Sequence, residues 1–131
     1  MAELRVENLV KTFGEVRAVD DVSFRVEDGE FLTLLGPSGC GKSTTLAAIA
    51  GLDRPDHGLI ALGGNVFFDG AKRRFVPPEG REIGLVFQSY ALWPHMTVWN
   101  NLDFPLKLRK IAKAERAKRI EEVLALVEMS E

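Results

Sequence analysis

The residues with the most distinctive chemistry form one short glycine-rich segment. Four of its positions match the pattern G-x-x-x-x-G-K-[ST]: Gly36, Gly41, Lys42 and Ser43. A phosphate chain needs many hydrogen-bond donors close together, and backbone N–H groups supply them where the chain wraps tightly without side chains in the way. The spacing therefore predicts a phosphate-binding loop over residues 36–43, called the phosphate loop below.

Two side chains of the phosphate loop are predicted to act directly on the ligand. Lys42 can reach the terminal phosphates as a point charge. The hydroxyl of Ser43 can coordinate Mg²⁺, which prefers oxygen ligands and phosphate partners. A chance match is the alternative reading, and it is disfavoured because the match lies between an apolar run and a helical segment, where the mechanism requires it.

Cys40, the single cysteine of the chain, also lies in this loop. We interpret it as a small filler in preference to a redox group. A bulky thiol reagent on it should block nucleotide binding, and bound nucleotide should protect it. One cysteine cannot form an intramolecular disulfide, which suits a reducing compartment.

The elements on either side of the loop must position it. Residues 31–35 form a continuous apolar run, as expected of a strand covered on both faces. Residues 42–50 are rich in Ala, Leu and Thr and predict a helix, which Gly51 should end. The predicted order is therefore buried strand, glycine loop, helix.

Several further strands are predicted from shorter patterns. Val22, Phe24 and Val26 alternate with polar residues, which indicates a half-buried strand. The turn signal Asp28-Gly29 predicts that this strand pairs antiparallel with residues 31–35. The remaining predicted strands cover residues 4–13, 59–62, 66–68 and 83–87, and residues 71–80 are predicted to be an exposed loop.

The last third of the chain predicts two helices. Thr97 can cap the first, which should stop or bend near Pro105. The second should cover residues 112–128, with one apolar face made of Ala117, Ile120, Leu124 and Val127. Basic residues between 107 and 119 are interspersed with acidic ones from Glu115 onward, which favours a solvated helix face over nucleic-acid binding.

Composition sets the broad class. The 131 residues are 46% hydrophobic and 27% charged with a net charge of −2, which is typical of a globular protein and argues against disorder and against a nucleic-acid footprint. No apolar run approaches the length of a bilayer span, and the N-terminus lacks a signal-peptide pattern. If the protein works at a membrane, we expect other chains to hold it there.

Three blocks together resemble the ATP-binding-cassette ATPases. They are residues 36–44 (GPSGCGKST), residues 49–52 (IAGL) and residues 86–98 (VFQSYALWPHMTV). The resemblance covers essentially the whole chain. It is strongest to the importer subgroup typified by the maltose-type sugar transporters, with polyamine and ferric-iron importers close behind.

The resemblance implies an α/β P-loop NTPase fold of the ATP-binding-cassette type, with an N-terminal antiparallel β-subdomain, present here in incomplete form. It divides the chain into three parts. The antiparallel β-subdomain would cover about 1–30 and 58–70, the P-loop core about 31–57 and 83–88, and the start of a helical subdomain about 97–131.

The resemblance also implies a site for ATP and Mg²⁺. Phe13 matches the aromatic that stacks on adenine, with a core aromatic as the alternative, and Val19 would line the same pocket. Gln88 would reach Mg²⁺ and the attacking water, with an ordinary loop glutamine as the alternative. Lys42 and Gln88 are then the catalytic residues, and Ser43 and Gln88 the metal ligands. The nucleotide would be held by Gly36, Pro37, Ser38, Gly39, Cys40, Gly41, Lys42, Ser43 and Thr44.

Partners follow from the same resemblance. The apolar Tyr90, Leu92 and Trp93 match a mobile stretch on which transmembrane permease subunits dock, although they could instead fill the local core. A second ATPase subunit would complete a dimer, and no nucleic acid is expected. The protein would be cytoplasmic and peripheral, on the inner face of the cell membrane. His95 is expected to be a hydrogen-bonding loop residue and not a metal ligand.

Some of the family's equipment has no match in this chain. There is no Leu-Ser-Gly-Gly-Gln signature, no apolar strand ending in Asp-Glu and no later switch histidine. Residues 66–69 resemble a magnesium-binding strand only superficially and are expected to form a surface hairpin. The resemblance implies that the parent is an ATPase that drives solute uptake, with sugar the favoured solute. The chain alone should be a nucleotide-binding module without turnover, and a soluble cassette ATPase of DNA repair or translation is the remaining alternative.

The same comparison raises a folding question. In the family's sheet, further strands lie between or beside those kept here, so residues 31–35 should expose apolar surface and unpaired backbone. We expect marginal stability, or an unusual assembly that covers the exposed edge.

Overall fold

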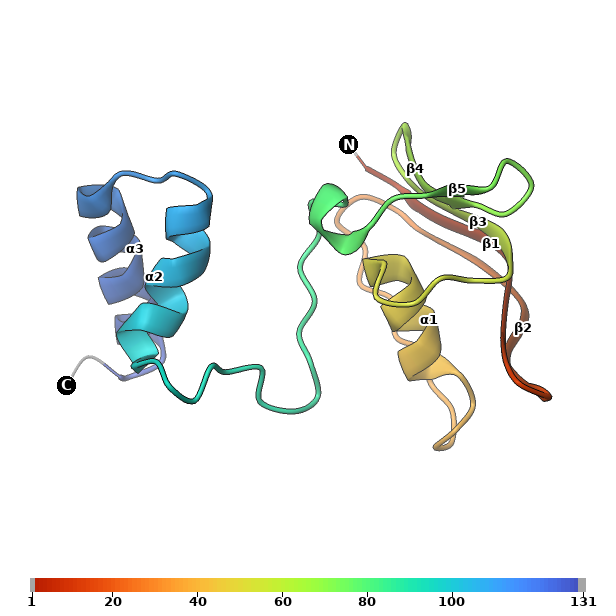
Figure 1. Cartoon of the computed structure of the whole chain (residues 1–131), viewed down its shortest axis with the longest axis horizontal. Helices are drawn as coiled ribbons and strands as arrows, with labels where there is room; N and C mark the ends of the chain where they lie inside the picture. The colour runs from red at the N-terminus through yellow and green to blue at the C-terminus, as the bar shows by residue number, and fades with distance from the viewer. Residues whose placement is uncertain (1, 130–131) are drawn as a thin grey trace. The chain divides into compact units, whose positions relative to one another are not determined.

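The computed structural model describes residues 2–129. The chain divides into two compact units, Met1–Leu85 and Val86–Glu131. The first unit contains a sheet and one α-helix, and the second contains two α-helices (Figure 1). Among the described residues, no helix combines the length and the apolar content that crossing a membrane requires.

The first unit is built on a five-stranded antiparallel sheet with the strand order β2-β1-β3-β4-β5. β1 pairs with β2 along one side and with β3 along the other. The strands predicted at residues 4–13, 22–26, 59–62 and 66–68 are confirmed, and the third and fourth form the expected hairpin. The prediction that this hairpin lies at the surface is wrong, because Phe67 and Phe68 are buried in the core. The bounds are Leu4–Phe13 (β1), Val16–Val26 (β2), His57–Leu62 (β3), Asn65–Asp69 (β4) and Arg74–Phe75 (β5).

The core of this unit lies between the sheet and α1, Lys42–Ala50. The buried residues do not alternate strictly along the strands: Val6 and Leu9 of β1 are three apart, and Phe67 and Phe68 of β4 are adjacent. Irregularities in the strand pairing interrupt the period of two. Figure 1 shows α1 beside the sheet, and its Ala48 is fully buried in the same cluster. The buried cluster consists of Val6, Leu9, Val19, Ala48, Ile60, Phe67 and Phe68.

The helix α1 has the bounds that its sequence predicts. It ends at Gly51, which adopts a left-handed φ of 82° and donates its N–H to the carbonyl of Ala48 at 3.2 Å. Glycine adopts this conformation without the clash that a Cβ atom brings, so the predicted C-terminal stop is confirmed.

Two predicted strands do not form. Residues 31–35 and 83–87 have no regular secondary structure, and side chains at both are largely in solvent: Phe31 is 92%, Leu35 95% and Val86 96% exposed. A strand covered on both faces is stable only beside hydrogen-bonded neighbours, and the sheet of the described residues offers neither segment a partner. The exposure expected for residues 31–35 is therefore present.

The predicted hairpin at Asp28-Gly29 is correct only as a turn. Gly29 has a φ of 76°, and the N–H of Glu30 donates to the carbonyl of Glu27 at 3.0 Å. The strand that should follow is missing, so β2 pairs with β1 alone. The loop predicted at residues 71–80 also contains more structure than expected, namely β5 and a 3₁₀ turn at Pro78–Gly80.

The second unit is a pair of packed helices, α2 (Val98–Leu108) and α3 (Lys113–Leu126). Thr97 caps α2 as predicted, because its hydroxyl accepts the N–H of Asn100 at 3.1 Å. Pro105 lies inside α2, one turn from its end, so the helix stops near this proline as expected. A half-buried ion pair of 2.6 Å, between Arg116 Nε and Asp103 Oδ1, joins α3 to α2.

The apolar face of α3 is partly as predicted. Ile120 is 2% exposed, and Ala117 and Leu124 are half-buried. Val127 is 57% exposed and lies just beyond the helix, which ends at Leu126 and not at 128.

Candidate functional site

The phosphate loop is a series of tight turns on the surface of the first unit. The N–H of Cys40 donates to the carbonyl of Pro37 at 3.3 Å, and Gly39 and Gly41 have φ angles of 80° and 91°. These angles lie in the region that glycine tolerates and other residues rarely adopt. The loop therefore wraps as its glycines predict, and its residues 37–40 are exposed to solvent.

Gly41 also needs to be a glycine because of what lies next to it. A Cβ atom at this position would be 2.2 Å from the carbonyl oxygen of Ala18 in β2 and 3.4 Å from Cγ2 of Val19. The phosphate loop is thus seated directly on β2. This contact fixes the start of α1 relative to the sheet.

The start of α1 favours an anion. Its N-cap, Gly41, has no side chain to cap the helix, and no acidic residue lies in the first turn. The first N–H groups of a helix have no intrahelical partner and carry the positive end of its dipole. A phosphate placed at the loop would receive these donors.

Lys42 lies across the loop. Its Nζ donates to the carbonyls of Gly36 at 2.5 Å and Pro37 at 2.7 Å, and it lies 3.3 Å from Sγ of Cys40. The ammonium group is therefore held above the turn by the loop's own carbonyls, where a phosphate oxygen could take over its donors. A Cβ on Gly36 would lie 2.5 Å from Sγ of Cys40, so the two ends of the loop are closely packed.

Two hydroxyl residues follow Lys42 in the first turn of α1. Ser43 is exposed and Thr44 is half-buried. The next residue, Thr45, is buried and closes the turn, because its N–H and hydroxyl both donate to the carbonyl of Gly41, at 2.9 and 2.8 Å. Ser43 is therefore the hydroxyl of this turn most open to a ligand.

The two residues assigned to the base lie on the β1–β2 hairpin. Phe13 ends β1, is 49% exposed and has the Nζ of Lys11 4.8 Å from its ring centre. It pairs with Val16, two residues before the contact of Ala18 with Gly41. Val19 is 3% exposed and belongs to the core cluster beneath the loop.

Arg81 is a positioning residue that the sequence pattern did not single out. Its Nη1 donates to the carbonyls of Ala48 and Ile49, at 2.8 and 2.7 Å, and its Nε donates to the carbonyl of Val76 at 2.7 Å. The side chain is 2% exposed, and burial lowers the pKa of its guanidinium below the ordinary value. It thereby ties the C-terminal end of α1, opposite the phosphate loop, to the segment that follows β5.

Aromatic rings enclose the same guanidinium. Its Cζ lies 5.3 Å from the ring centre of Phe67 and 5.2 Å from that of Phe75. Arg81 is more than thirty residues away in the chain from its partners in α1, so no local sequence pattern reveals these contacts. The one available signal was an arginine two residues before the apolar segment at residues 83–87.

Gln88 and the apolar residues after it belong to the second unit. Gln88 lies in an exposed segment without helix or strand, and Tyr90 and Leu92 are 96% and 64% exposed. Trp93 is 43% exposed and packs edge-on against Phe104, with ring centres 5.1 Å apart. Tyr90 and Leu92 thus lie at the surface of this unit, and Trp93 lies against α2.

Asn101 fixes this segment to α2 and was also missed by the sequence patterns. Its Oδ1 accepts the N–H of Trp93 at 2.9 Å, and its Nδ2 donates to the carbonyls of Met96 and Thr97 at 3.3 and 2.9 Å. The amide of Asn101 therefore fixes how the segment before Thr97 enters α2.

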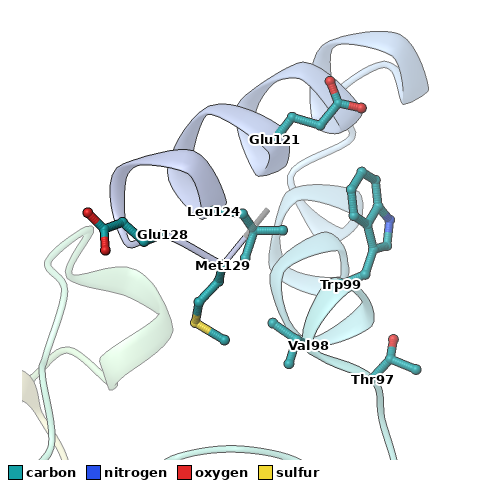
Figure 2. A pocket seen from close by; sticks show the side chains of 7 residues that line it. All are labelled: Thr97, Val98, Trp99, Glu121, Leu124, Glu128 and Met129. Carbon is teal, nitrogen blue, oxygen red and sulfur yellow. The ribbon is translucent and has the colours of Figure 1, made fainter. Parts of the chain in front are cut away.

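A hollow lies entirely in the second unit. It measures about 680 Å³ and lies between the start of α2 and the end of α3 (Figure 2). Most of its lining side chains are apolar, and Glu121 and Glu128 add two carboxylates. None of the predicted nucleotide-site residues lines it. Its lining is Thr97, Val98, Trp99, Glu121, Leu124, Glu128 and Met129.

Comparison with known proteins decides the family. A family model described as ABC transporter matches residues 19–131. The chain belongs to this family. Among solved structures, the dimeric structure of MJ0796, a bacterial ABC transporter cassette, matches this ABC chain with a TM-score of 0.79 and 32% identity, covering 95% of the chain and 57% of the cassette. The predicted α/β fold class of ABC type is thereby confirmed.

Several curated relatives of this ABC chain are named as import proteins. The trehalose/maltose import ATP-binding protein MalK of Thermococcus litoralis is 53% identical over 131 residues, which is all of the chain and 35% of the relative. The spermidine/putrescine import ATP-binding protein PotA of Nitrosomonas eutropha is 53% identical over 130 residues, which is 99% of the chain and 34% of the relative. The chain thus spans about a third of the length of the curated relatives it matches.

Proposed function

We propose that the chain supplies the phosphate-binding part of the ATP-binding subunit of an ABC importer, whose parent couples ATP hydrolysis to solute uptake. The observation that carries this proposal is the phosphate loop itself. It is a glycine-rich turn seated on β2, it opens onto an uncapped helix start without acidic residues, and it holds the ammonium of Lys42 above it.

In this proposal Lys42 and the backbone N–H groups of residues 36–44, other than Pro37, hold the phosphates. Phe13 stacks on the adenine, and its exposed ring at the end of β1 supports that role. Val19 shapes the pocket floor from below the loop, since it lies next to Gly41. Gln88 orients the attacking water, because its amide can accept a hydrogen bond without carrying charge.

Mg²⁺ would be bound together with the nucleotide. Among the described residues, no three His, Cys, Asp or Glu side chains are grouped to hold a metal ion. Mg²⁺ takes most of its ligands from phosphate and water, and in this proposal the Ser43 hydroxyl and the Gln88 amide are the ligands that this chain adds. When bound, Mg²⁺ would neutralise charge that develops on the phosphates.

The partners are proposed to be transmembrane permease subunits and a second ATPase subunit. The exposed Tyr90 and Leu92, with Trp93 beside them, support a docking patch for the permease. The subunit would then be cytoplasmic and held on the inner face of the membrane by its partners. A soluble cassette ATPase of DNA repair or translation is the alternative, and co-purification with a membrane-embedded complex would separate the two.

A sugar is the solute we propose for the parent transporter. The similarity to the trehalose/maltose import protein supports it, and the equally similar polyamine import protein makes a polyamine the alternative. Uptake of labelled maltose against labelled spermidine by cells with the intact transporter would distinguish them.

The domain arrangement remains a proposal as well. The antiparallel β-subdomain would cover about 1–30 and 58–70, the P-loop core about 31–57 and 83–88, and the helical subdomain would start at about 97–131. Because the chain contains no signature motif and no Asp-Glu strand, we propose that it binds ATP by itself without turnover.

The test is titration of MgATP into the full chain by calorimetry. Lys42→Ala removes a charged hydrogen-bond donor and should weaken binding about ten- to a hundredfold. Lys72→Ala is the matched control, because Lys72 is an exposed lysine outside the loop. No heat with the unmodified chain, or equal affinity of the Lys42 and Lys72 variants, would contradict the proposal.

A further inference from the structure

The connection between α2 and α3 carries a cluster of exposed positive charge. Its sequence over residues 107–113 is KLRKIAK, without an acidic residue. Four basic side chains there, called the basic turn below, are all exposed: Lys107, Arg109, Lys110 and Lys113. Among the described residues, none of the four forms an ion pair.

The basic residues that follow in α3 are different. Arg116 is paired with Asp103 at 2.6 Å, Lys118 with Glu122 at 3.9 Å, and Arg119 with Glu115 at 2.6 Å. The acidic residues on either side of the turn, Asp103 and Glu115, are therefore already engaged. The positive charge of the basic turn is left to act on something outside the unit.

Helix stability accounts for the positions of only two of the four basic residues. Lys107 and Arg109 lie at the C-terminal end of α2, where the helix dipole favours a cation. Lys110 has a left-handed φ of 58°, at the position after the helix cap where glycine is favoured. Lys113 starts α3, where the dipole disfavours a cation and Ala112 offers no side-chain cap. Two lysines thus stand where local structure prefers other residues, a conflict that often marks a functional position.

We propose that the basic turn binds the anionic phospholipid headgroups of a membrane surface. Clusters of four or more Lys and Arg side chains are attracted to such surfaces. Leu108 lies among the four cations and is 67% exposed, so an apolar group accompanies the charges. Cations beside an exposed apolar side chain suit the interface where phosphates and hydrocarbon meet.

A nucleic acid is the competing kind of partner, and it is less well matched. Single strands are bound by a positive groove together with aromatic side chains that stack on the bases. No aromatic residue occurs after Phe104 in this chain. The basic turn therefore offers charge without a stacking platform.

The experiment is flotation of the full chain with vesicles of phosphatidylcholine alone and of phosphatidylcholine mixed with phosphatidylglycerol. The unmodified chain should bind the mixed vesicles only, and added salt should weaken binding. One variant carries Lys107→Gln, Arg109→Gln, Lys110→Gln and Lys113→Gln. Since each cation contributes about fivefold, its partition coefficient should fall by about a hundredfold or more.

A matched control removes the same charge from four exposed, ion-paired side chains elsewhere, with Arg17→Gln, Arg25→Gln, Lys118→Gln and Arg119→Gln. The control should bind the mixed vesicles far better than the basic-turn variant, and circular dichroism should give both the helix content of the unmodified chain. Equal losses in both variants, or equal binding to both kinds of vesicle, would overturn the inference.

A second comparison addresses the nucleic-acid alternative. Polyuridine should not displace the unmodified chain from the mixed vesicles. Displacement that depends on the basic turn would make a nucleic acid the partner and overturn the inference. Vesicle binding needs no nucleotide, so a chain that binds MgATP and ignores anionic vesicles would overturn this inference alone and leave the proposed function standing.

Discussion

Gly41 joins three features of the site in one residue. It lies in the phosphate loop, it directly precedes the first residue of α1, and its backbone lies against the carbonyl of Ala18 in β2. The pattern that predicts phosphate binding requires a glycine here for conformational reasons. The structure adds a packing reason, because no side chain fits between the loop and β2.

Gly41→Ala should therefore reduce both stability and nucleotide binding more than the addition of a single methyl group would suggest. A non-glycine residue in the left-handed conformation costs about 1–2 kcal/mol. In addition, the new Cβ atom would lie 2.2 Å from the carbonyl oxygen of Ala18 and clash with it. We expect loss of MgATP binding by calorimetry and a lower free energy of unfolding in urea. Gly14→Ala is the matched control, because Gly14 also has a positive φ, 59°, but nothing within 4 Å of the added Cβ. Equal destabilisation by both substitutions would rule out the packing effect.

Arg81 gives a second prediction at this scale. Arg81→Lys keeps the charge but cannot reach the carbonyls of Ala48, Ile49 and Val76 together, and an unsatisfied buried group costs about 1–3 kcal/mol. We expect a melting temperature several degrees lower and weaker MgATP binding, because the far end of α1 loses its tie. Arg74→Lys, at an exposed position of β5, should change neither. An unchanged melting temperature in Arg81→Lys would contradict the positioning role.

The elements that the sequence predicted correctly are those with local signals. α1 lies between Gly41 and Gly51, which each adopt a left-handed φ, and β3 and β4 are joined by a glycine turn. The apolar runs at residues 31–35 and 83–87 gave an equally clear pattern and form no strand. Their state depends on partner strands far away in sequence, which a local pattern cannot supply.

The same distinction applies to the candidate site. The phosphate loop was predictable because its donors are consecutive in the chain. Arg81 and Asn101 were not, since their roles consist of hydrogen bonds that only the folded chain creates. Arginine and asparagine occur commonly on surfaces, and nothing local marks these two as buried or engaged.

Thr97 carries a prediction for one element. Its hydroxyl is the cap of α2, and the same turn is where Asn101 holds the preceding segment. Thr97→Ala should cost about 1 kcal/mol and reduce helix content in the second unit, as measured by circular dichroism during thermal unfolding. Thr97→Ser keeps the hydroxyl and should behave like the unmodified chain. If Thr97→Ser lost as much helix content and stability as Thr97→Ala, the cap hydrogen bond would not be the cause of the loss.

For the whole molecule, the exposed apolar segments matter more than any single contact. Phe31 and Leu35 present apolar side chains on a backbone that has no strand partner among the described residues. An extended segment with unpaired backbone N–H and C=O groups and exposed apolar side chains can pair with another chain. The isolated chain should therefore associate with itself as its concentration rises.

The double substitution Phe31→Gln and Leu35→Gln should suppress that association. Neither side chain contributes to the buried cluster, so the free energy of unfolding should change little while the apolar attraction is removed. Sedimentation velocity over a range of concentrations measures the effect. Val16→Gln with Leu126→Gln is the control, because these residues are 67% and 83% exposed but belong to a paired strand and a helix. We expect the control to associate like the unmodified chain, and an unmodified chain that stays monomeric at every concentration would refute the prediction.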